Sequence, residues 1–375
     1  MKVALVCDWL TNVGGAEKVL LELHKLYPKA PIYTSKYSRK GIDWFDDADV
    51  RTGWLQIFPT CLRRILGPLR QRWFEKLDLS EYDLIISVTG AEAKAVKSGK
   101  WRCEHGEPTK NPRGIHVSYC HVPTQYYWQM HDEYVRDPGF GLLNPLVRFC
   151  FKILVRPLRK ADYRAAQVPE QIVTISEYAR ELIDKYYHRK AVVIHPPVEI
   201  EEFGGSLQTP HEYYIITSRQ VNWKRIDLAV KACMKLRREL YVVGEGPEHN
   251  NLVKLSNESE LIKFVPLVGK EELAELLAGA KGYIFPSKEP FGIAPVEALA
   301  AGCPVIAYGE GGALDYVTKE NGVLFKKQSI KDLTDAILEF EGHKFDRDKV
   351  VKSAKKFDVR RFDKEIRELI DEKVG

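Results

Sequence analysis

The stretch MKVALVCDWLTNVGGAEKVLLELHKL, residues 1–26, sets the pattern for the whole chain. Residues 2–7 form an apolar run with the length of a buried strand, and Gly14 and Gly15 follow it as a turn. From residue 16 to about residue 26, apolar side chains recur every three or four positions, which predicts an amphipathic helix. A strand, a glycine turn and a helix in this order are typical of the start of an α/β domain with a parallel sheet.

The same alternation recurs along the rest of the chain, which has 375 residues. Short apolar runs between helical stretches predict further buried strands at residues 84–87, 115–119, 172–174, 213–217, 240–243, 262–265, 282–285 and 305–307. Such runs predict parallel sheets covered by helices on both faces. Because the chain is too long for one ordinary core, we expect an α/β fold with two Rossmann-like, doubly wound domains that face each other across a cleft.

Two consecutive prolines at positions 196–197 mark the boundary between these domains. A double proline continues neither a helix nor a central strand, and the polar, glycine-containing residues 199–211 behind it fit a linker. We therefore place the N-terminal domain at residues 1–197 and the C-terminal domain at residues 198–357. The amphipathic end of the chain, residues 358–375, is predicted to be a helix that crosses back to the N-terminal domain.

Composition and charge narrow the functional classes. The chain contains no uncharged apolar run of about 18 residues, so no transmembrane helix is expected. The apolar start is interrupted by Asp8 and lacks a small-residue cleavage site, which favours a buried strand over a signal peptide. The net charge of +5 and the isoelectric point of about 8.6 are below what a nucleic-acid-binding domain would show. They suit a protein that handles anions or touches an anionic membrane surface, and no nucleic-acid partner is expected.

The seven cysteines are odd in number and scattered, and no two of them form a CxxC motif. This pattern indicates reduced thiols in a cytoplasmic protein. Cys103 with His105 and Cys120 with His121 could be drawn as a metal site, but neither pair has the ligand spacing of a zinc finger.

Two segments combine basic residues with aromatic and aliphatic ones, as helices at a membrane interface do. For residues 55–77, a membrane-surface helix and an ordinary packed helix with a solvated basic face are equally good interpretations. For residues 146–164, the packed helix is the better interpretation. We therefore expect a cytoplasmic protein that can associate peripherally with the inner face of the cell membrane through residues 55–77.

Three features in the second half of the chain point to a phosphorylated ligand. Arg219 and Lys224 follow a predicted strand at the start of a helix that is expected over residues 224–236. Two cations at such a position can hold a diphosphate. Gly244 belongs to a tight strand-to-helix turn, GEGP, that lacks the full spacing of a dinucleotide fingerprint. Glu289 and Glu297 stand eight positions apart in the stretch EPFGIAPVE.

Taken together, these motifs resemble glycosyltransferase family 4, a retaining GT-B family. The matching motifs are NVGGAEKV, CHVP, VTISEYAR, HPPVE, SRQVNWKR, VVGEGPE and EPFGIAPVEALAAGCPVIA, which follow the family's order over nearly the whole chain. The last of them is a specific match, whereas the glycine turns alone are not. Within the family, the chain is most similar to the mannosyltransferases of bacterial surface-polysaccharide assembly.

The resemblance implies a role for individual residues of each domain. In the N-terminal domain, which would bind the acceptor, Gly14 and Gly15 would let the backbone approach the donor phosphate and the acceptor. His121 would contact the sugar near its anomeric carbon.

In the C-terminal domain, which would bind the nucleotide-sugar, Arg219 and Lys224 would hold the diphosphate and stabilise it as it leaves. Glu297 would accept hydrogen bonds from the ribose, and Glu289 would face the sugar. The donor-binding set implied by the resemblance is completed by Gly244 and by the backbone of Phe291, Gly292 and Ile293.

The implied reaction is the transfer of a hexose, with mannose from GDP-mannose as the expected donor, to a glycan or a polyprenyl-diphosphate-linked acceptor. Fixed cations and backbone N–H groups suit the charge that builds up on a departing diphosphate. Because such groups can replace a metal ion, no metal and no other cofactor is expected. Retention through front-face attack, with the leaving phosphate accepting the acceptor's proton, is the preferred mechanism, and a double displacement is the alternative.

Two departures from the family pattern and three other hypotheses remain open. Pro266 replaces a frequent glycine in a loop that usually approaches the nucleobase, which leaves the base open, and Asp315 replaces a frequent glutamate. The other hypotheses are a UDP-sugar-dependent transferase of the same fold, a non-catalytic nucleotide-sugar-binding module, and a GT-B-like epimerase. The complete set of four charged residues in the C-terminal domain argues against the non-catalytic module.

Overall fold

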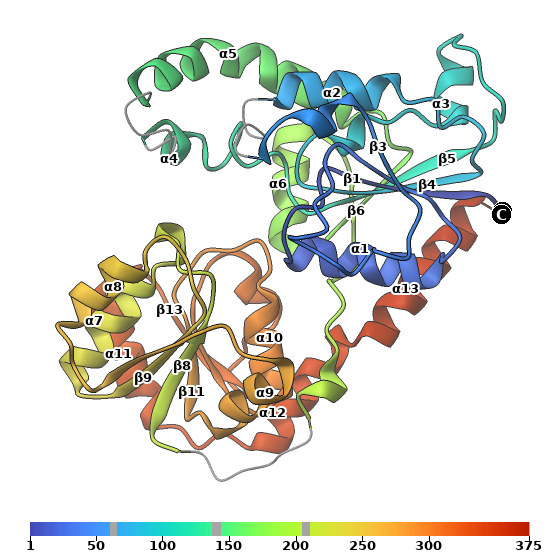
Figure 1. The fold of residues 1–375 in the computed structure, drawn as a ribbon. Helices are drawn as coiled ribbons and strands as arrows, with labels where there is room; N and C mark the ends of the chain where they lie inside the picture. The colour runs from blue at the N-terminus through green and yellow to red at the C-terminus, as the bar shows by residue number, and fades with distance from the viewer. Residues whose placement is uncertain (61–65, 137–143, 205–210, 375) are drawn as a thin grey trace. The chain divides into compact units, whose positions relative to one another are not determined.

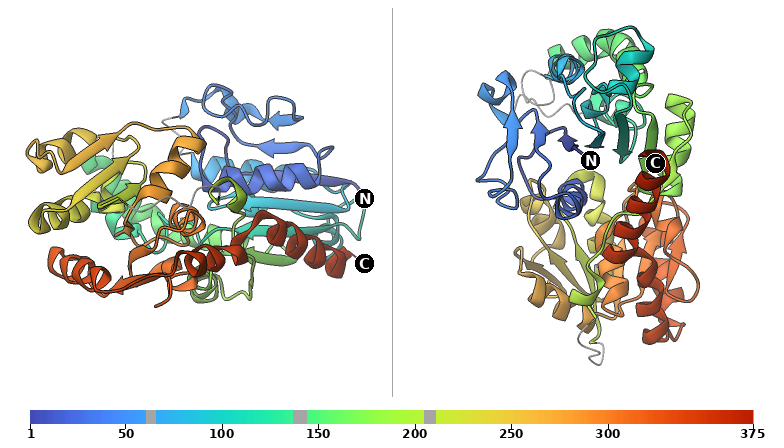
Figure 2. Two further views of the ribbon diagram at one scale, coloured as in Figure 1. Left: turned by 90° about the horizontal axis from the view of Figure 1, so that it is seen from below. Right: turned by 90° about the vertical axis from the view of Figure 1, so that its right-hand side faces the viewer.

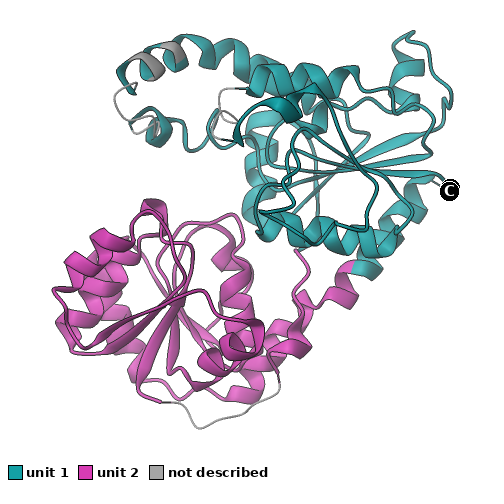
Figure 3. Ribbon diagram, in the orientation of Figure 1, with its two compact units in different colours: residues 1–195, 363–375 teal, residues 196–362 magenta. Residues whose placement is uncertain are grey.

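The computed structural model describes residues 1–60, 66–136, 144–204 and 211–374 (Figure 1). The chain divides into two compact units, which Figure 3 shows in different colours. Unit 1 contains residues 1–195 together with residues 363–375, and unit 2 contains residues 196–362. Both chain ends therefore belong to unit 1, where they lie close together (Figure 2). The last helix, α13 (Val359–Val374), begins in unit 2 and ends in unit 1.

Unit 1 is built around a seven-stranded parallel sheet in the order β3-β2-β1-β4-β5-β6-β7. Its strands are β1 (Val3–Cys7), β2 (Ile32–Thr34), β3 (Val50–Thr52), β4 (Leu84–Thr89), β5 (Ile115–Cys120), β6 (Gln171–Thr174) and β7 (Val192–Val193). Its helices are α1 (Gly15–Leu26), α2 (Gly67–Lys76), α3 (Gly99–Glu104), α4 (His131–Arg136), α5 (Asn144–Ala165) and α6 (Glu177–Tyr187).

Helices cover both faces of this sheet, with α1 on one face and α2 on the other (Figure 1). Phe74 of α2 and Ala165 of α5 pack against Ala4 and Val6 of β1 in one buried cluster. All five residues of β1 are buried, as expected for a central strand with helices on both sides.

Unit 2 has a six-stranded parallel sheet in the order β10-β9-β8-β11-β12-β13. Its strands are β8 (Tyr213–Thr217), β9 (Glu239–Val243), β10 (Ile262–Val265), β11 (Gly282–Phe285), β12 (Val305–Tyr308) and β13 (Gly322–Phe325). Its helices are α7 (Ile226–Leu236), α8 (His249–Ser256), α9 (Lys270–Gly279), α10 (Ile293–Ala300), α11 (Ile330–Glu341) and α12 (Arg347–Ala354). The core joins β8 to α7 and α11 through buried residues such as Tyr214, Ala229 and Ile337.

The predicted parallel α/β architecture and every predicted strand are confirmed, but four strands were missed. The missed strands are β2, β3, β7 and β13, which have two to four residues and form the outer parts of the two sheets. The prediction that a helix begins at residue 224 is wrong. Residues Asn222–Lys224 form a separate 3-10 turn, and Arg225 has a left-handed backbone with φ of 54°, so α7 begins at Ile226.

Strand order positions the functional residues of both units. Strand order reverses direction between β1 and β4 in unit 1, and between β8 and β11 in unit 2. In doubly wound sheets, the loops that leave the carboxyl ends of these strands part at this point and form the usual ligand site. Asp8 and Gly90 follow β1 and β4, while Arg219 and Glu289 follow β8 and β11.

Candidate functional site

Lys224 and Glu289 meet at the switch point of the unit 2 sheet. Lys224 lies in the turn after β8, and Glu289 lies in the loop after β11. The Nζ of Lys224 is 2.5 Å from the Oε1 of Glu289, and the Ser287 hydroxyl donates to the same oxygen over 2.7 Å. The lysine and glutamate side chains are only 18% and 12% exposed, so the pair is largely shielded from water. Topology thus brings together two charges that are 65 residues apart in the sequence.

The other cation predicted for this site, Arg219, has a different environment. Its side chain is exposed and makes no hydrogen bond or ion pair with another described residue. Nearby in sequence, Trp223 is half exposed, and the Nζ of Lys224 lies 4.6 Å from the centre of its indole ring. The structure therefore holds Lys224 in place and leaves the Arg219 guanidinium available to an anion.

The turn after β9 approaches the loop after β8 very closely. Gly244 has a φ of +117°, and a Cβ built on it would lie 2.5 Å from the Ser218 carbonyl oxygen. A Cβ on Gly246 would lie 2.3 Å from the Gln220 carbonyl oxygen. Side chains at these two positions are therefore excluded by the neighbouring backbone, which explains the glycines of the GEGP turn.

Gln220 joins these two loops, and sequence analysis missed it. Its backbone N–H donates to the Glu245 carbonyl over 2.8 Å, and its side-chain amide donates to the Gly244 carbonyl over 2.5 Å. Its side-chain oxygen is 2.9 Å from Nδ1 of His249. Gln220 is fully buried between the two predicted cations, but no spacing or motif signals a buried glutamine in a polar loop.

The loop from Glu289 to α10 is held by contacts with its own unit. Gly292 precedes α10 with a φ of +94°, a conformation that favours glycine. The Tyr316 hydroxyl donates to the Phe291 carbonyl over 3.0 Å, and the Gly312 N–H donates to the Glu289 carbonyl over 2.8 Å. Because the backbone is anchored at both ends, the loop presents a fixed surface at the start of α10.

Glu297 lies one turn into α10 and is only 7% exposed. Its carboxylate and that of Glu289 both raise the pKa of the same buried phenol, Tyr283 of β11. Burial raises the pKa of Tyr283, hydrogen bonds to Thr217 lower it in part, and the two carboxylates raise it further. Both predicted glutamates therefore lie within electrostatic reach of the Tyr283 hydroxyl, which donates to the Thr217 carbonyl at the carboxyl end of β8.

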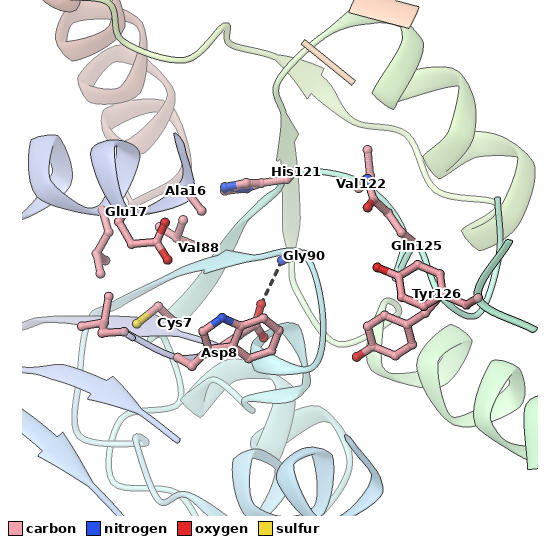
Figure 4. A pocket seen from close by; sticks show the side chains of 14 residues that line it. Cys7, Asp8, Ala16, Glu17, Val88, Gly90, His121, Val122, Gln125 and Tyr126 are labelled. Atoms are coloured by element: carbon pink, nitrogen blue, oxygen red, sulfur yellow. Dashed lines mark hydrogen bonds between the residues drawn. The ribbon is translucent and has the colours of Figure 1, made fainter. Parts of the chain in front are cut away.

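Unit 1 has its own cavity, of about 280 Å³, at the carboxyl ends of its central strands (Figure 4). Its lining residues are Cys7, Asp8, Trp9, Leu10, Ala16, Glu17, Leu20, Val88, Gly90, His121, Val122, Gln125, Tyr126 and Tyr134. Two of them are acidic, Asp8 and Glu17, and none is a lysine or an arginine. The other lining groups are apolar, aromatic or neutral.

Asp8 anchors the loop that follows β4. Its carboxylate accepts hydrogen bonds from the backbone N–H groups of Gly90, Ala91 and Ala93 over 2.7 to 3.0 Å, and from the Thr89 hydroxyl over 3.0 Å. These contacts connect the carboxyl ends of β1 and β4. Asp8, which in the sequence stands out only because it interrupts an apolar run, thus has a clear structural role.

His121 lies at the end of β5 and points into the cavity (Figure 4). Its ring packs edge-on against Tyr119, with 5.6 Å between ring centres, and neither ring nitrogen has a hydrogen-bond partner among the described residues. Burial lowers the pKa of His121 to about 4, although the nearby Asp8 carboxylate raises it in part. At neutral pH the imidazole is therefore uncharged and can exchange a hydrogen bond with a ligand.

The predicted glycines Gly14 and Gly15 stand at the start of α1, beside this cavity. Gly14 is the N-cap with an extended backbone, which other residues also adopt. A Cβ on Gly14 would lie 2.8 Å from a carboxylate oxygen of Glu17, so the constraint comes from that flexible side chain. The sequence motif did not single out Glu17, although this residue is part of NVGGAEKV and lines the cavity.

Two buried ion pairs join the elements around the cavity. Arg70 of α2 donates to Glu92 over 2.6 Å, and the Tyr126 hydroxyl donates to the other oxygen of Glu92 over 2.8 Å. Lys94 lies 2.7 Å from Asp162 of α5. All four charged side chains are at most 3% exposed. They fix α2 and α5 to the segment after β4 that Asp8 also anchors.

Comparison with known proteins finds a family match within unit 2. Residues 200–357 match the family model described as glycosyl transferases group 1. The matched residues contain Arg219, Lys224, Gly244, Glu289 and Glu297, all predicted for the donor site.

Curated relatives of the glycosyl transferases group 1 domain include an uncharacterized glycosyltransferase, YqgM of Bacillus subtilis, which is 29% identical over 184 residues. They also include the alpha-1,3/1,6-mannosyltransferase ALG2 of Mus musculus, 25% identical over 233 residues. These matches cover 45% and 53% of this chain, which spans about half the length of both relatives, 51% and 52%.

Among solved structures, HepE from Anabaena in complex with UDP-glucose matches with a TM-score of 0.72. The match covers 99% of this chain and all of HepE, at 18% sequence identity. The similarity confirms the GT-B fold class for a chain with two Rossmann-like parallel sheets.

Two searches of the described residues concern metals and membranes. Where the structure describes the chain, no group of three or more His, Cys, Asp or Glu side chains is arranged to hold a metal ion. Among these same residues, no helix is both long and apolar enough to cross a bilayer. Metal independence and peripheral membrane association stay predictions.

Proposed function

We propose that the protein is a retaining glycosyltransferase that transfers a hexose from a nucleotide-sugar to a glycan or a lipid-linked acceptor. The observation that carries the proposal is the shielded Lys224–Glu289 pair at the switch point of the glycosyl transferases group 1 domain. The pair stands at the carboxyl ends of the strands, where doubly wound α/β sheets bind ligands.

Lys224 and Arg219 are proposed to bind the donor diphosphate. The Lys224 ammonium has three N–H donors and uses one toward Glu289, so others are free to reach a phosphate while the glutamate fixes the side chain. Arg219 is exposed and can add a two-pronged contact. Positive charge held in place before the reaction stabilises the diphosphate as it leaves, so no metal is required.

The two glutamates are proposed to bind opposite ends of the donor. Glu297 accepts hydrogen bonds from the ribose, and Glu289 faces the sugar with the backbone of Phe291, Gly292 and Ile293 beside it. A carboxylate near the anomeric carbon stabilises the positive charge that develops there. We favour front-face attack with retention; trapping of a covalent glycosyl-enzyme would establish a double displacement instead.

The donor is proposed to be GDP-mannose. Similarity to ALG2, which is named a mannosyltransferase, supports mannose, whereas the solved complex of HepE contains UDP-glucose and supports the alternative of a UDP-sugar donor. A thermal-shift screen with GDP-, UDP- and ADP-sugars separates the two, because a ligand that binds the native state raises its melting temperature.

The acceptor is proposed to enter the cavity of unit 1 with an uncharged sugar residue. The cavity lining includes two carboxylates and an uncharged imidazole, and it includes no lysine or arginine. Such a lining disfavours a phosphate or a uronate, while Trp9, Tyr126 and Tyr134 offer aromatic surface to a sugar ring. A lipid-linked glycan fits if its neutral terminal sugar, not its diphosphate, occupies the cavity.

Nucleoside diphosphate release from a panel of nucleotide-sugars, with neutral glycosides as acceptors, tests the proposal. We expect release that depends on the acceptor and a product with the anomeric configuration of the donor. Tight binding of a nucleotide-sugar without any turnover would support the non-catalytic binding module. An altered sugar on the recovered nucleotide would indicate an epimerase.

A further inference from the structure

Helix α5 of unit 1 exposes an unusual amount of apolar surface. Phe149 is 64% exposed, Ile153 57% and Leu154 50%. Phe149 and Ile153 are four positions apart, so their side chains share one face of the helix. Exposed aliphatic residues that occur singly need no explanation, but three large ones within six positions of a single helix form a patch.

The exposed charges on the same helix are all positive. The exposed charged residues of α5 are Arg148, Lys152, Arg156, Lys160 and Arg164. Its only acidic residue, Asp162, is buried and pairs with Lys94. At helical spacing, Arg156 and Lys160 continue the face of Phe149, since they follow it at seven and eleven positions. Acidic residues near this face come from α4, which packs against α5 and carries Asp132 and Glu133.

Helix α2 extends this surface. The two helices touch where the Gln71 amide donates to the Ala161 carbonyl over 3.1 Å, and Figures 1 and 2 show both on the same side of unit 1. On α2, Leu69 is 43% exposed and has the exposed cations Arg72 and Lys76 as neighbours. The apolar residues and cations of α5 thus have counterparts on the adjoining helix.

We infer that α5, with α2 beside it, docks unit 1 onto an anionic membrane surface. An amphipathic helix with aromatic and aliphatic residues among lysines and arginines inserts its apolar side chains at the level of the lipid headgroups. The cations then lie against the negatively charged lipids. The excess of exposed positive charge on α5 favours an anionic membrane over an uncharged protein surface as the partner. The inference is independent of the transferase activity, and it reverses the packed-helix interpretation of residues 146–164.

Vesicle flotation of the full chain tests the docking surface. We expect the protein to float with vesicles of phosphatidylcholine and phosphatidylglycerol, and to stay at the bottom with phosphatidylcholine alone. A double variant, Phe149→Ser with Ile153→Ser, and a charge variant, Arg156→Glu with Lys160→Glu, should each reduce partitioning by roughly tenfold or more. High salt should release the wild-type protein from the anionic vesicles, because it screens the attraction between charges.

Leu338→Ser is the matched control, because Leu338 is 52% exposed on α11 of unit 2 and has acidic neighbours, Asp335 and Glu339. This variant should float like the wild type. Failure of the wild type to float with anionic vesicles would overturn the inference, as would unchanged flotation of both α5 variants. The wild type could instead fail to bind vesicles and form a concentration-dependent dimer in light scattering. If the α5 variants then lose this dimer, a second copy of the chain covers the surface and the inference is overturned.

Discussion

Lys224 and Glu289 illustrate how a binding site is prepared at the scale of single residues. The glutamate receives the lysine and the Ser287 hydroxyl on one oxygen, and its backbone carbonyl receives the Gly312 N–H. Fixed in this way, the two charges need little reorganisation when a ligand arrives, which is the condition under which electrostatic catalysis is strong. The hydrogen bonds explain the position of the pair, whereas its role in transfer is the proposal.

Loss of either partner should abolish transfer without unfolding the protein. We expect Lys224→Ala and Glu289→Ala to lower kcat by about 10²- to 10³-fold, the range for removing a group that stabilises transition-state charge. Lys288→Ala is the matched control, since Lys288 forms a 2.5 Å pair with Glu310 on the exposed side of the same loop. Near-normal turnover in either site variant, or equal losses in the control, would remove Lys224 and Glu289 from the active site.

Gly244 should be intolerant of any side chain. Gly244→Ala combines a backbone with positive φ with a Cβ that would lie 2.5 Å from the Ser218 carbonyl oxygen. We expect a loss of about 1–3 kcal/mol in the free energy of unfolding, the range for local backbone strain, measured by urea denaturation. Gly204→Ala is the control, because its Cβ would meet nothing closer than 3.6 Å. Equal stability of the two variants would contradict the close approach of the loops.

Two buried histidines should make the protein sensitive to mild acid. Burial lowers the pKa of His121 to about 4 and that of His116 to about 3. Between these values and the usual pKa near 6.5, the unfolded chain binds more protons than the folded one, so stability falls as the pH falls. Above about pH 6.5 this contribution is fully present.

The variant His121→Asn isolates the contribution of one histidine. We expect its free energy of unfolding to fall less steeply between pH 6.5 and 4.5 than that of the wild type, by on the order of 1 kcal/mol or more. Chemical denaturation at several pH values measures this slope. Parallel slopes for the two proteins would mean that His121 is not buried in its neutral form.

At the scale of elements, central strands were predictable and outer ones were not. Central strands such as β4 and β8 are covered on both faces, so their sequences are nearly continuous apolar runs that stand out. Edge strands are short and partly exposed; β3 reads Val-Arg-Thr and has no buried residue. The start of α7 was misplaced because a left-handed residue, Arg225, separates it from the preceding turn, and arginine gives no signal for that conformation.

Loss of one partner from a buried ion pair between elements should lower the free energy of unfolding strongly. Arg70→Ala would leave the Glu92 carboxylate buried beneath the unit 1 cavity without its guanidinium. Breaking such a pair costs about 3–5 kcal/mol, whereas a surface cation contributes little. The control is Arg72→Ala, two positions along α2, where the side chain is exposed. A similar small loss in both variants, measured by denaturation, would contradict the anchoring role of Arg70.

At the scale of the whole molecule, parts of the site were accessible from sequence and parts were not. Arg219 and Lys224 were found because they follow a predicted strand at the edge of a sheet where ligands bind, and the resemblance to a known family led to Glu289 and Glu297. Gln220 and the buried ion pairs of unit 1 carry no such signal, since their partners are distant in sequence and only tertiary packing brings them together. Lys94 and its counter-ion Asp162, near the C-terminal end of α5, are 68 positions apart.

Release of nucleoside diphosphate by the purified full chain is the most direct test of the glycosyltransferase proposal. Wild type, Lys224→Ala, Glu289→Ala and the control Lys288→Ala are each incubated with GDP-, UDP- and ADP-sugars and a neutral glycoside acceptor. We predict acceptor-dependent release from at least one donor, with GDP-mannose the best, by the wild type and the control only. Absence of release from every donor, or undiminished release by the Lys224 and Glu289 variants, would contradict a transferase site built on this pair.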